Sequence, residues 1–526
     1  MEKHVGWLRV LGAFLLALIV GILAGSLVQT QFNLLALQNL GVEIGLGTRL
    51  QTSLEDLVNF VPVYGVVFGA SFLLSQMVTS LFIRLLDLRW RTSFLSLGAA
   101  VGLWVTFKLV DSLAPMPTLI AATRGAGGMM AMLATAALSG WLFAHFSWRR
   151  GSGKMPRHFA IGAVLITLGW TAPQEPVQAD ASSGYRLETF AIGLEHPWSL
   201  AFLPDGRALV TERPGRLRLL SADGNKVSAP LSGVPKVFAS GQGGLFDVLI
   251  APDFDESRHI YLAYACGTWS ANHTCVARGR LVPGGLDNVQ EVFRSLPAKT
   301  GDAHFGGRMV WLPDATLILT LGDGFDYREE AQRLTSHIGT IVRINRDGSA
   351  PQDNPFTTDS NALPEIYSYG HRNVQGVVFD WRNNRLIAHE HGPRGGDEIN
   401  VIESGCNYGW PVATRGLDYT GARVSPFTEY DGMEPPALHW TPSIAPSGMT
   451  LYDGDLFPEW RGSLLVGALA ARRVHRVVLS NDGAVDMETL FGELGERIRD
   501  VRTGPGGAVF LLTDSPEGRV IRVTPW

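Results

Sequence analysis

The stretch PWSLAFLPDGRALVTERPGRLRLLSADG, residues 197–224, contains the pattern that decides the fold of the second half of the chain. Its PDG and ADG triplets are turn signals, and the runs between them alternate apolar and polar residues, as short strands do. The stretch therefore predicts short strands that are joined by tight turns and followed by a polar loop.

Similar units recur further along the chain. They are GGRMVWLPDATLILTLGDG (306–324), VQGVVFDWRNNRLIAHEHGP (374–393), MTLYDGDLFPEWRGSLLVGALAARRVHRVVL (449–479) and IRDVRTGPGGAVFLLTDSPEGRVIRVTP (498–525). After residue 180 no stretch has a long helical period. Degenerate units of this kind are typical of β-propeller blades, which surround a central channel. At ~40 to 60 residues a blade, we predict an all-β, six-bladed β-propeller over residues 185–526.

The first part of the chain is different, because long apolar runs dominate it up to about residue 173. Five segments are candidate membrane helices: 7–28, 60–85, 93–109, 129–146 and 159–170. Most are near the ~20 residues that a helix needs to cross a bilayer, although the fifth is short. We therefore predict an α-helical membrane domain over 1–173, a linker over 174–184 and the propeller after it.

Basic residues flank these segments unevenly. They lie before the first segment, between the second and third, and between the fourth and fifth: Lys3, Arg9, Arg84, Arg89, Arg91, Arg149, Arg150, Lys154 and Arg157. The alternate connections, about 30–58 and 112–120, hold only Arg49. Because Lys and Arg are retained on the cytoplasmic side, the N-terminus is predicted to be inside. Five spans then place the propeller outside, which in a Gram-negative bacterium means an inner-membrane protein that faces the periplasm.

The fifth segment has a second interpretation. Basic residues, a short apolar run and then PVQADA (176–181) resemble a signal peptide with a small-residue cleavage site. Cleavage would release the soluble half without changing the topology. We favour a retained span, because four preceding spans make an internal signal sequence unusual.

Three ionisable residues, Lys108, Asp111 and Arg124, lie near the outer ends of the third and fourth segments. They either mark a functional site such as a quinone pocket or extend their charged groups to the membrane interface.

Composition excludes some functions. The net charge of -5 and the pI near 6.2 show no basic balance, so nothing suggests nucleic acid as a partner. The three cysteines form no CxxC or CxxCH motif, which argues against a zinc site or attached haem. Cys266 and Cys275 lie between two strand-like runs, and we expect a disulfide there in an oxidising compartment. The alternative is two free buried thiols, and Cys406 is expected to stay unpaired.

Polar side chains gather in loops that follow strands. These loops are SGQGGLFD with Gln242, GDAHFGGR with His304, YGHRNVQG with Arg372 and Asn373, HGPRGGDEIN, NYGWP, and GERIRDV with Arg497 and Arg499. A propeller brings such loops together over its channel mouth. Guanidinium groups bind planar oxygen pairs, so three arginines at one place indicate a ligand with several carboxylates or carbonyls.

Each candidate also has a structural interpretation. A lone loop histidine such as His304 usually fills a turn or a core. Arg497 and Arg499 alternate along a strand and therefore face the same side, where solvent is the usual partner. Gln242 lies between glycines and can cap a turn. Asp323, in LGDG, is expected to form a blade turn rather than to take part in chemistry.

The motifs LEHPWSLAFLPDGRALVTERPGRL, HFGGR, YGHRN, HEHGPRGGDEIN and APSGM occur in an order that resembles one family. This family is the glucose/sorbosone dehydrogenases, which includes the soluble pyrroloquinoline quinone (PQQ)-dependent aldose sugar dehydrogenases. The resemblance covers about residues 185–526. It implies that His304 is the general base, a role that suits an imidazole with an ordinary pKa of about 6.5. The glycines around His304 are expected to let a flat cofactor and a sugar ring approach the backbone.

The resemblance also implies which residues bind the cofactor and calcium. The residues that match PQQ-binding positions are Gln242, Arg372, Asn373, Tyr419, Arg497 and Arg499. The carbonyl oxygens of Gly392 and Pro393 match those that bind a Ca²⁺ bridging to PQQ, where the ion polarises a quinone carbonyl. Glu398 and the backbone of Tyr408 match a second, structural calcium site.

The chain departs from the family pattern at three positions. Ala303 stands where some members have an aspartate next to the base. Ala470 replaces a lysine that contacts PQQ, with Arg472 two residues further on, and Val374 replaces a proline. The base and the calcium ligands match the pattern.

Together these features predict a membrane-anchored quinoprotein dehydrogenase that oxidises an aldose at C1 to the lactone. Because the chain has no haem motif, electrons must pass to a separate acceptor, such as ubiquinone or a periplasmic cytochrome. Two other functions remain open. A calcium-dependent propeller lactonase would have no use for three arginines at one place. A non-catalytic, membrane-tethered propeller that binds a sugar or a protein is compatible with Ala303 and Ala470.

Overall fold

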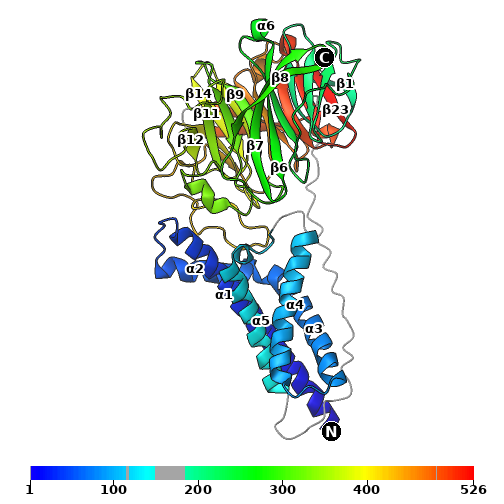
Figure 1. Ribbon diagram of the computed structural model, residues 1–526, viewed down its shortest axis with the longest axis vertical. Helices are drawn as coiled ribbons and strands as arrows, with labels where there is room; N and C mark the ends of the chain where they lie inside the picture. Colours follow the sequence, from blue (N-terminus) through cyan, green and yellow to red (C-terminus); the bar gives the residue numbers. More distant parts are fainter. Residues whose placement is uncertain (1, 114–117, 148–183, 481–482) are drawn as a thin grey trace.

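The structure is a computed structural model that describes residues 2–113, 118–147, 184–480 and 483–526. Figure 1 shows two parts, a bundle of long helices and a β-propeller at one end of it. The predicted fifth span, 159–170, and nearly all of the predicted linker, 174–184, lie outside the described residues.

The unit at 197–224 folds as its pattern predicts. Strands β2 (Pro197–Phe202), β3 (Ala208–Glu212) and β4 (Arg216–Leu220) pair in antiparallel order. In the PDG turn between β2 and β3, Gly206 has a φ of +84°, a conformation that favours glycine. The turn triplets therefore end the strands where the sequence indicated.

Six such sheets form the propeller, which confirms the predicted fold and blade number. The second blade contains β5 (Leu245–Ile250), β6 (His259–Thr268), β7 (Ala271–Val282) and β8 (Gly285–Arg294), and the third contains β9 (Gly306–Trp311), β10 (Leu317–Leu321), β11 (Thr340–Ile344) and β12 (Ile366–Tyr369). The fourth contains β13 (Val374–Asp380), β14 (Arg385–Glu390), β15 (Asp397–Ile402) and β16 (Leu438–Trp440), and the fifth contains β17 (Pro446–Leu451), β18 (Ser463–Ala468), β19 (Val474–Ser480) and β20 (Gly483–Leu490). The sixth contains β21 (Ile498–Thr503), β22 (Val509–Thr513), β23 (Gly518–Pro525) and β1 (Tyr185–Leu194). Because β1 pairs with β23, the first and last strands share a blade and close the ring. Cys266 and Cys275 form the predicted disulfide between β6 and β7, and Cys406 is free.

Charged side chains of the innermost strands fill the centre of the ring. Arg308 of β9 lies 3.0 Å from the Asp500 carboxylate of β21, and its guanidinium stacks 3.9 Å above the ring of Trp198. Arg502 donates to Asp247 of β5 at 3.0 Å and to Asp500 at 2.8 Å. Burial lowers the pKa of Arg308 to about 10, so the guanidinium stays charged at neutral pH. Two cations and two anions from three blades therefore balance one another beneath the loops.

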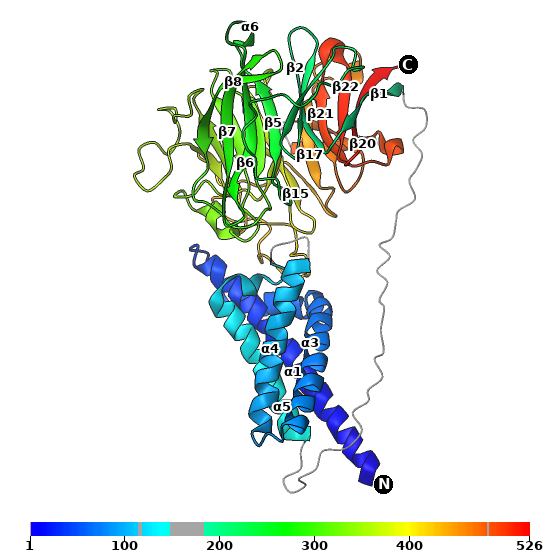
Figure 2. The same cartoon turned by 45° about the vertical axis from the view of Figure 1, so that its right-hand side comes forward.

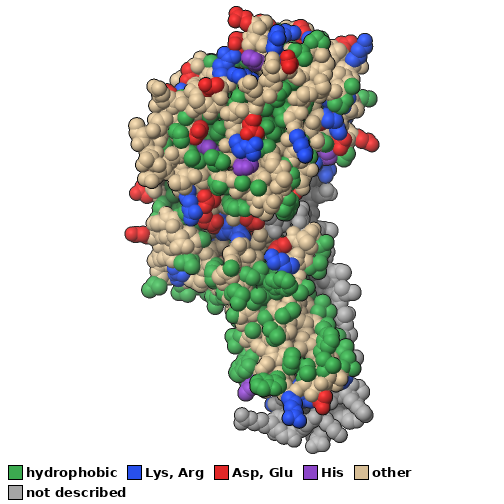
Figure 3. Space-filling model, in the orientation of Figure 1, with side chains coloured by type: hydrophobic (Ala, Val, Ile, Leu, Met, Phe, Trp, Pro, Cys, Tyr) green, Lys and Arg blue, Asp and Glu red, His purple; other side chains and the backbone are tan. Residues whose placement is uncertain are grey.

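Within residues 2–113 and 118–147, the helical half contains four helices that are long and apolar enough to cross a membrane. The helices are α1 (Glu2–Gln38), α3 (Val61–Leu85), α4 (Arg91–Leu113) and α5 (Ala126–Ser147), with α2 (Leu46–Asn59) and the short η1 (Ala121–Arg124) between them. Aromatic rings such as Phe68, Phe72 and Phe143 pack inside the bundle, while large apolar side chains cover its outside (Figure 3). Four of the five predicted spans thus correspond to long apolar helices.

The outer connections differ from the prediction in one respect. The first helix continues to Gln38 instead of ending near residue 28, and α2 occupies much of the connection expected at 30–58. Both additions lie at the propeller end of the bundle, whereas the N-terminal end of α1 lies far from the propeller (Figure 2). The connections with few basic residues therefore face the propeller, as the predicted orientation requires.

Polar contacts dock the helical half against the propeller. Arg124, just before the fourth predicted segment, donates from Nη1 and Nη2 to both carboxylate oxygens of Glu329 at 3.0 and 2.8 Å. Thr118 donates to Asp326 at 3.1 Å. The guanidinium of Arg124 thus pairs with the propeller rather than only reaching to the membrane interface.

A second group of contacts joins α1 and α2 to the loop before β16. Asn33 of α1 donates to the carbonyl of Arg423 at 2.9 Å, and Arg423 donates to Glu55 of α2 at 2.7 Å. Beside them, Leu37 and Val42 bury an apolar patch against Val412. The two halves are therefore fixed to each other by both charge and apolar burial.

Replacing Arg124 with alanine is expected to loosen this docking. The change removes both hydrogen bonds from Arg124 and leaves the partly buried Glu329 with Arg328 alone, at 3.2 Å. We expect a cost of roughly 1–3 kcal/mol, or ~5- to 150-fold in local opening. The rate of amide hydrogen exchange at residues 118–124 and 326–330 should increase accordingly, while the exchange rate in the β2–β4 blade should stay the same. Arg333→Ala is the matched control, because Arg333 is half-exposed and pairs with Glu330 within the same propeller segment. Equal exchange rates in Arg124→Ala and the unmodified protein would contradict the docking.

Candidate functional site

His304 lies in the loop before β9, and its side chain is buried. Its φ of +48° turns the chain sharply at this residue. The ring nitrogen Nδ1 lies 2.6 Å from Oδ1 of Asp323, which follows β10. The backbone N–H of His304 donates to Oε1 of Gln242 at 2.9 Å. One contact orients the imidazole, and the other holds its backbone.

The carboxylate of Asp323 fixes the tautomer of His304. It also accepts the Phe325 N–H and the Trp410 indole N–H, each at 2.8 Å. Burial alone would raise the pKa of Asp323, but the charges of His304 and Arg372 and these hydrogen bonds lower that pKa. An ionised carboxylate only accepts hydrogen bonds, so Nδ1 donates and Nε2 of the neutral ring carries no proton. Burial, and then Arg372, lower the pKa of His304, so the ring is a neutral base at neutral pH.

The expectation that Asp323 serves only as a turn residue is therefore wrong. The position next to the candidate base, Ala303, has no acidic side chain, but its carbonyl accepts a hydrogen bond from the Lys299 ammonium at 2.9 Å. Lys299 is buried 3.4 Å from the centre of the Phe305 ring, and burial lowers its pKa to about 7. Sequence reasoning gave Asp323 only a turn role and missed Lys299. The pairing of β9 with β10 brings Asp323 to His304, and Lys299 lies five residues before His304 in the chain.

The glycines after His304 have a structural role in the packing of β9. Gly306 and Gly307 have φ angles of +66° and +98°. A side chain at Gly306 would lie 2.6 Å from the Thr320 carbonyl, and one at Gly307 would lie 2.7 Å from the Phe246 ring. These glycines let β9 approach its neighbours closely.

The amides predicted to contact the cofactor hold the two ends of the His304 loop. Gln242 accepts from the backbone of His304, as described above, and its own N–H donates to the Asp302 carbonyl at 2.8 Å. Asn373 accepts the Gly306 N–H at 3.2 Å and is buried. The structure therefore brings both amides to the candidate base.

Arg372 and Tyr419 lie in the same cluster. The buried Arg372 donates to the carbonyl of Gly392 at 2.7 Å and to the Tyr419 hydroxyl at 3.4 Å. The Tyr419 ring stacks on Phe325 at 6.2 Å, and Phe325 packs at 5.2 Å against His304. A cation and two aromatic faces thus surround the histidine.

Arg497 and Arg499 lie on another side of the channel mouth. Both bind Asp514, at 3.3 and 2.8 Å, which confirms that they face the same side. Arg213, which sequence reasoning missed, lies near them: burial first, and then both arginines, lower its pKa. With three guanidinium groups near one carboxylate, this side of the mouth is positively charged.

The predicted calcium ligands of the active site are backbone carbonyls. The Gly392 carbonyl accepts from Arg372, and Pro393 lines the cavity described below. In the described part of the chain, one group of three His, Cys, Asp or Glu ligand atoms lies close enough for one ion, and two of its members are the disulfide cysteines. A cation beside His304 would therefore depend on carbonyl oxygens.

Glu398 and Tyr408 belong to a separate buried cluster. Asn400 donates to Glu390 at 3.2 Å and to Glu398 at 3.4 Å. Burial, and then the charge of Glu390, raise the pKa of Glu398 well above its usual value. Tyr408 stacks at 4.8 Å on His371, whose Nδ1 lies 3.0 Å from Glu390. A buried carboxylate, Glu390, beside a partly buried one, Glu398, makes this a place that favours a cation.

A narrow cavity joins the cluster around His304 to the helical half. Its lining includes Asp323, Phe325, Arg372, Pro393, Trp410 and Tyr419 of the propeller, and Thr118, Ala121 and Arg124 of the helical half. The cavity holds only about 30 Å³, less than a planar cofactor needs. The exposed side chains of Gln242 and Arg497 show where the channel mouth opens.

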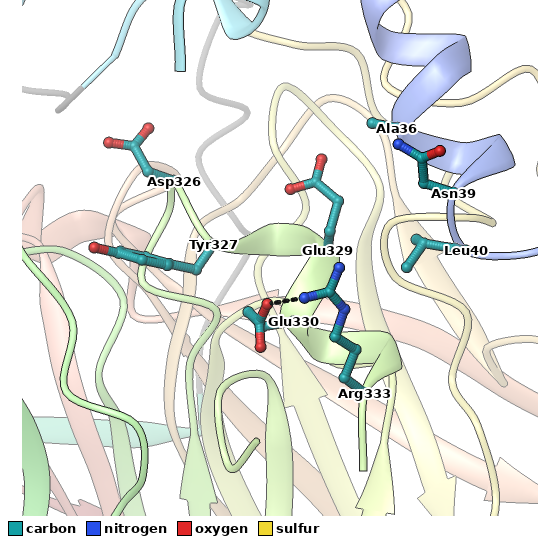
Figure 4. A pocket seen from close by; sticks show the side chains of 8 residues that line it. All are labelled: Ala36, Asn39, Leu40, Asp326, Tyr327, Glu329, Glu330 and Arg333. Atoms are coloured by element: carbon teal, nitrogen blue, oxygen red, sulfur yellow. Dashed lines mark hydrogen bonds and ion pairs between the residues drawn. The ribbon is translucent and has the colours of Figure 1, made fainter. Parts of the chain in front are cut away.

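A larger cavity of about 260 Å³ lies elsewhere along the joint. Figure 4 shows Ala36, Asn39 and Leu40 of α1 on one side of it and the segment 326–333 on the other. Its charged lining consists of three carboxylates and Arg333, which pairs with Glu330 at 2.6 Å. An acidic lining does not suit a ligand with several carboxylates, so the arginine-rich mouth is the better candidate site.

Comparisons with known proteins identify the family of the chain. The profile described as glucose/sorbosone dehydrogenase matches residues 194–522, and the chain belongs to this family. Aldose sugar dehydrogenase YliI of Escherichia coli (strain K12) is 43% identical over 352 residues, which are 66% of this chain and 94% of that protein.

Two solved structures resemble the propeller. The soluble aldose sugar dehydrogenase of Escherichia coli in its apo-form has a TM-score of 0.63 and 43% identity, and the match covers 65% of this chain and all of that one. The PQQ-bound aldose sugar dehydrogenase of Streptomyces coelicolor has a TM-score of 0.54 and 30% identity, covering 65% and 98% of the two chains. The chain is thus similar to PQQ sugar dehydrogenases over its propeller, and the helical half lies before the family region.

Proposed function

We propose that the protein is a membrane-anchored, PQQ-dependent dehydrogenase that oxidises an aldose at C1 to the lactone. The observation that carries the proposal is the His304–Asp323 pair, which leaves an unprotonated Nε2 beside a mouth rich in arginine. PQQ, when bound, supplies the hydride acceptor for the C1 hydrogen of the sugar. His304 takes the proton of the C1 hydroxyl at Nε2, and Asp323 stabilises the imidazolium that results.

The charge of the mouth suits this cofactor. PQQ is planar and carries three carboxylates, and Arg372, Arg497 and Arg499 offer guanidinium groups for them. Gln242 and Asn373 would donate amide N–H bonds, and Tyr419 would provide an aromatic face. A lactonase would need acidic or amide side chains around one ion instead.

We propose two calcium sites. The first uses the carbonyls of Gly392 and Pro393, and the bond from Arg372 to Gly392 would have to yield to the ion. The second uses Glu398 and the Tyr408 backbone, where the neighbouring Glu390 adds negative charge. Ca²⁺ accepts such mixed oxygen ligands in flexible geometry.

Residues 1–173 would anchor the protein in the inner membrane of a bacterium, and 174–184 would link the anchor to the propeller at 185–526 in the periplasm. Ubiquinone, or else a periplasmic cytochrome, would accept the electrons. The docked helical half supports a membrane acceptor, because its residues line the cavity next to Asp323. Reconstituted holoenzyme that reduces a soluble dye but never a ubiquinone analogue would remove quinone from this proposal.

Replacing Arg372 with methionine is expected to weaken PQQ binding. Loss of hydrogen bonds from a charged group costs roughly 1.5–3 kcal/mol, which is ~10- to 150-fold in Kd. Quenching of tryptophan fluorescence during PQQ titration of the apo-protein measures this change. Arg382→Met is the matched control, since Arg382 is exposed and pairs with Asp453 away from the mouth. Unchanged affinity in Arg372→Met would argue against the proposed cofactor position.

The pH dependence of kcat/KM should report the His304 base. The lowered pKa keeps the ring neutral, and thus able to accept a proton, above that pKa; activity is lost as the pH falls through it. The acid limb should therefore lie below the ordinary histidine value of about pH 6.5. Initial rates of dye reduction across the acid and neutral range give the profile. An acid limb centred above pH 7 or so would contradict a neutral, buried base.

A further inference from the structure

Helix α2 presents an apolar stripe that touches no other part of the described chain closely. Leu46, Leu50, Leu54 and Val58 recur every four residues and are 86%, 64%, 56% and 71% exposed. Residues at this spacing lie on one face of a helix. Four large apolar side chains on one exposed face are unusual for a surface in contact with water.

The opposite face of α2 is fully engaged. Asp56 is buried; one of its carboxylate oxygens accepts the Thr30 hydroxyl at 2.6 Å and the other accepts the Arg423 N–H at 2.7 Å. Ser53 accepts from Gln31 of α1 at 3.1 Å. The helix thus lies between α1 and the propeller on its polar side, while the stripe is exposed, with the polar Gln51 and Asn59 also exposed beside it.

We propose that this stripe is a membrane-binding surface that lies in the outer leaflet of the bilayer. A helix of 14 residues is about 21 Å long, which is too short to span a bilayer. Because α2 is amphipathic, with one apolar and one polar face, it resembles an interfacial helix. Lipid is favoured over a second copy of the chain because the stripe continues into the apolar outside of the bundle. α3 begins at Val61 directly after α2, and its Val66 is 64% exposed.

The position of α2 connects the bilayer to the channel mouth. Figure 1 places α2 at the outer end of the bundle, beneath the propeller. Its Glu55 and Asp56 bind Arg423 of the propeller. The same helix that rests on lipid therefore holds the propeller at a fixed height, with the cavity beside Asp323 close to the membrane surface. This inference does not depend on the proposed enzyme activity.

Site-directed fluorescence tests the proposal on the full chain. Leu50→Cys and, separately, Leu54→Cys are made in a Cys406→Ser background, labelled with an environment-sensitive NBD fluorophore and reconstituted in phosphatidylcholine vesicles. Emission at both positions should shift to shorter wavelength, resist quenching by aqueous iodide, and be quenched by spin-labelled lipid with the label near the headgroups. Met487→Cys is the matched control, because Met487 is an exposed apolar residue of β20 in the propeller, and it should show the opposite behaviour.

Two results would overturn the proposal. Long-wavelength emission with full iodide quenching at Leu50 and Leu54 would place the stripe in water. Short-wavelength emission that is not quenched by spin-labelled lipid, and that shifts to longer wavelength as the protein is diluted in the vesicles, would place the stripe against a second copy of the chain. Agreement between the two labelled positions guards against a local effect of one label.

Discussion

His304→Gln is expected to lower kcat for aldose oxidation by ~10²–10⁴-fold, because a positioned general base contributes about that factor. Glutamine fills similar space and can bond to Asp323, so the loop should keep its shape, but it cannot accept a proton near neutral pH. Steady-state dye reduction with saturating PQQ and Ca²⁺ measures the loss.

The control for this variant is another histidine. His439→Gln changes an exposed residue of β16, so its kcat should match that of the unmodified protein. PQQ affinity should be similar in both variants, because the proposed role of His304 is in proton transfer rather than in cofactor binding. If His304→Gln kept more than about a tenth of the activity, His304 would not be the base.

Asp323→Asn should have the second large effect, about 10²–10⁴-fold in kcat. The amide can donate to Nδ1 of His304, which favours the tautomer with a proton on Nε2, the nitrogen that must accept one. As a positioning residue, Asp323 should also affect the pH profile: the imidazolium loses its buried counter-charge, so the acid limb should move. PQQ affinity should change little.

A nearby carboxylate provides the comparison for Asp323→Asn. Asp326 lies in the same loop, but its carboxylate accepts a hydrogen bond from the Thr118 hydroxyl instead of contacting His304. Asp326→Asn should therefore leave kcat within a few-fold of the value for the unmodified protein. Loss of activity in Asp323→Asn without any change in the pH profile would indicate general damage to the loop instead of a change in the tautomer of His304.

Much of the fold was predictable because local patterns determine it. Turn triplets such as PDG end strands by their own backbone preferences, and the alternation between them selects the buried face. The membrane helices follow from apolar length alone. The disulfide was predictable because Cys266 and Cys275 lie on neighbouring strand-like runs.

The rest depends on tertiary contacts that leave no local trace. Asp323 has the sequence context of a turn residue, and the antiparallel pairing of β9 with β10 inside one blade brings it to His304. Arg124 was seen as a charged residue near a membrane, and its partner Glu329 lies 205 positions away. The Leu46-to-Val58 stripe is present in the sequence, but α2 is too short to resemble a membrane span and lies in a connection that was expected to be outside the bilayer.

The most direct test of the central claim is activity of the reconstituted holoenzyme. Apo-protein in bilayer discs is incubated with PQQ and Ca²⁺, and dye reduction is followed with a panel of aldoses. We expect aldose-dependent reduction that requires PQQ, and its loss in His304→Gln. Bound PQQ with no activity on any aldose would contradict the account and favour a propeller that only binds its ligand.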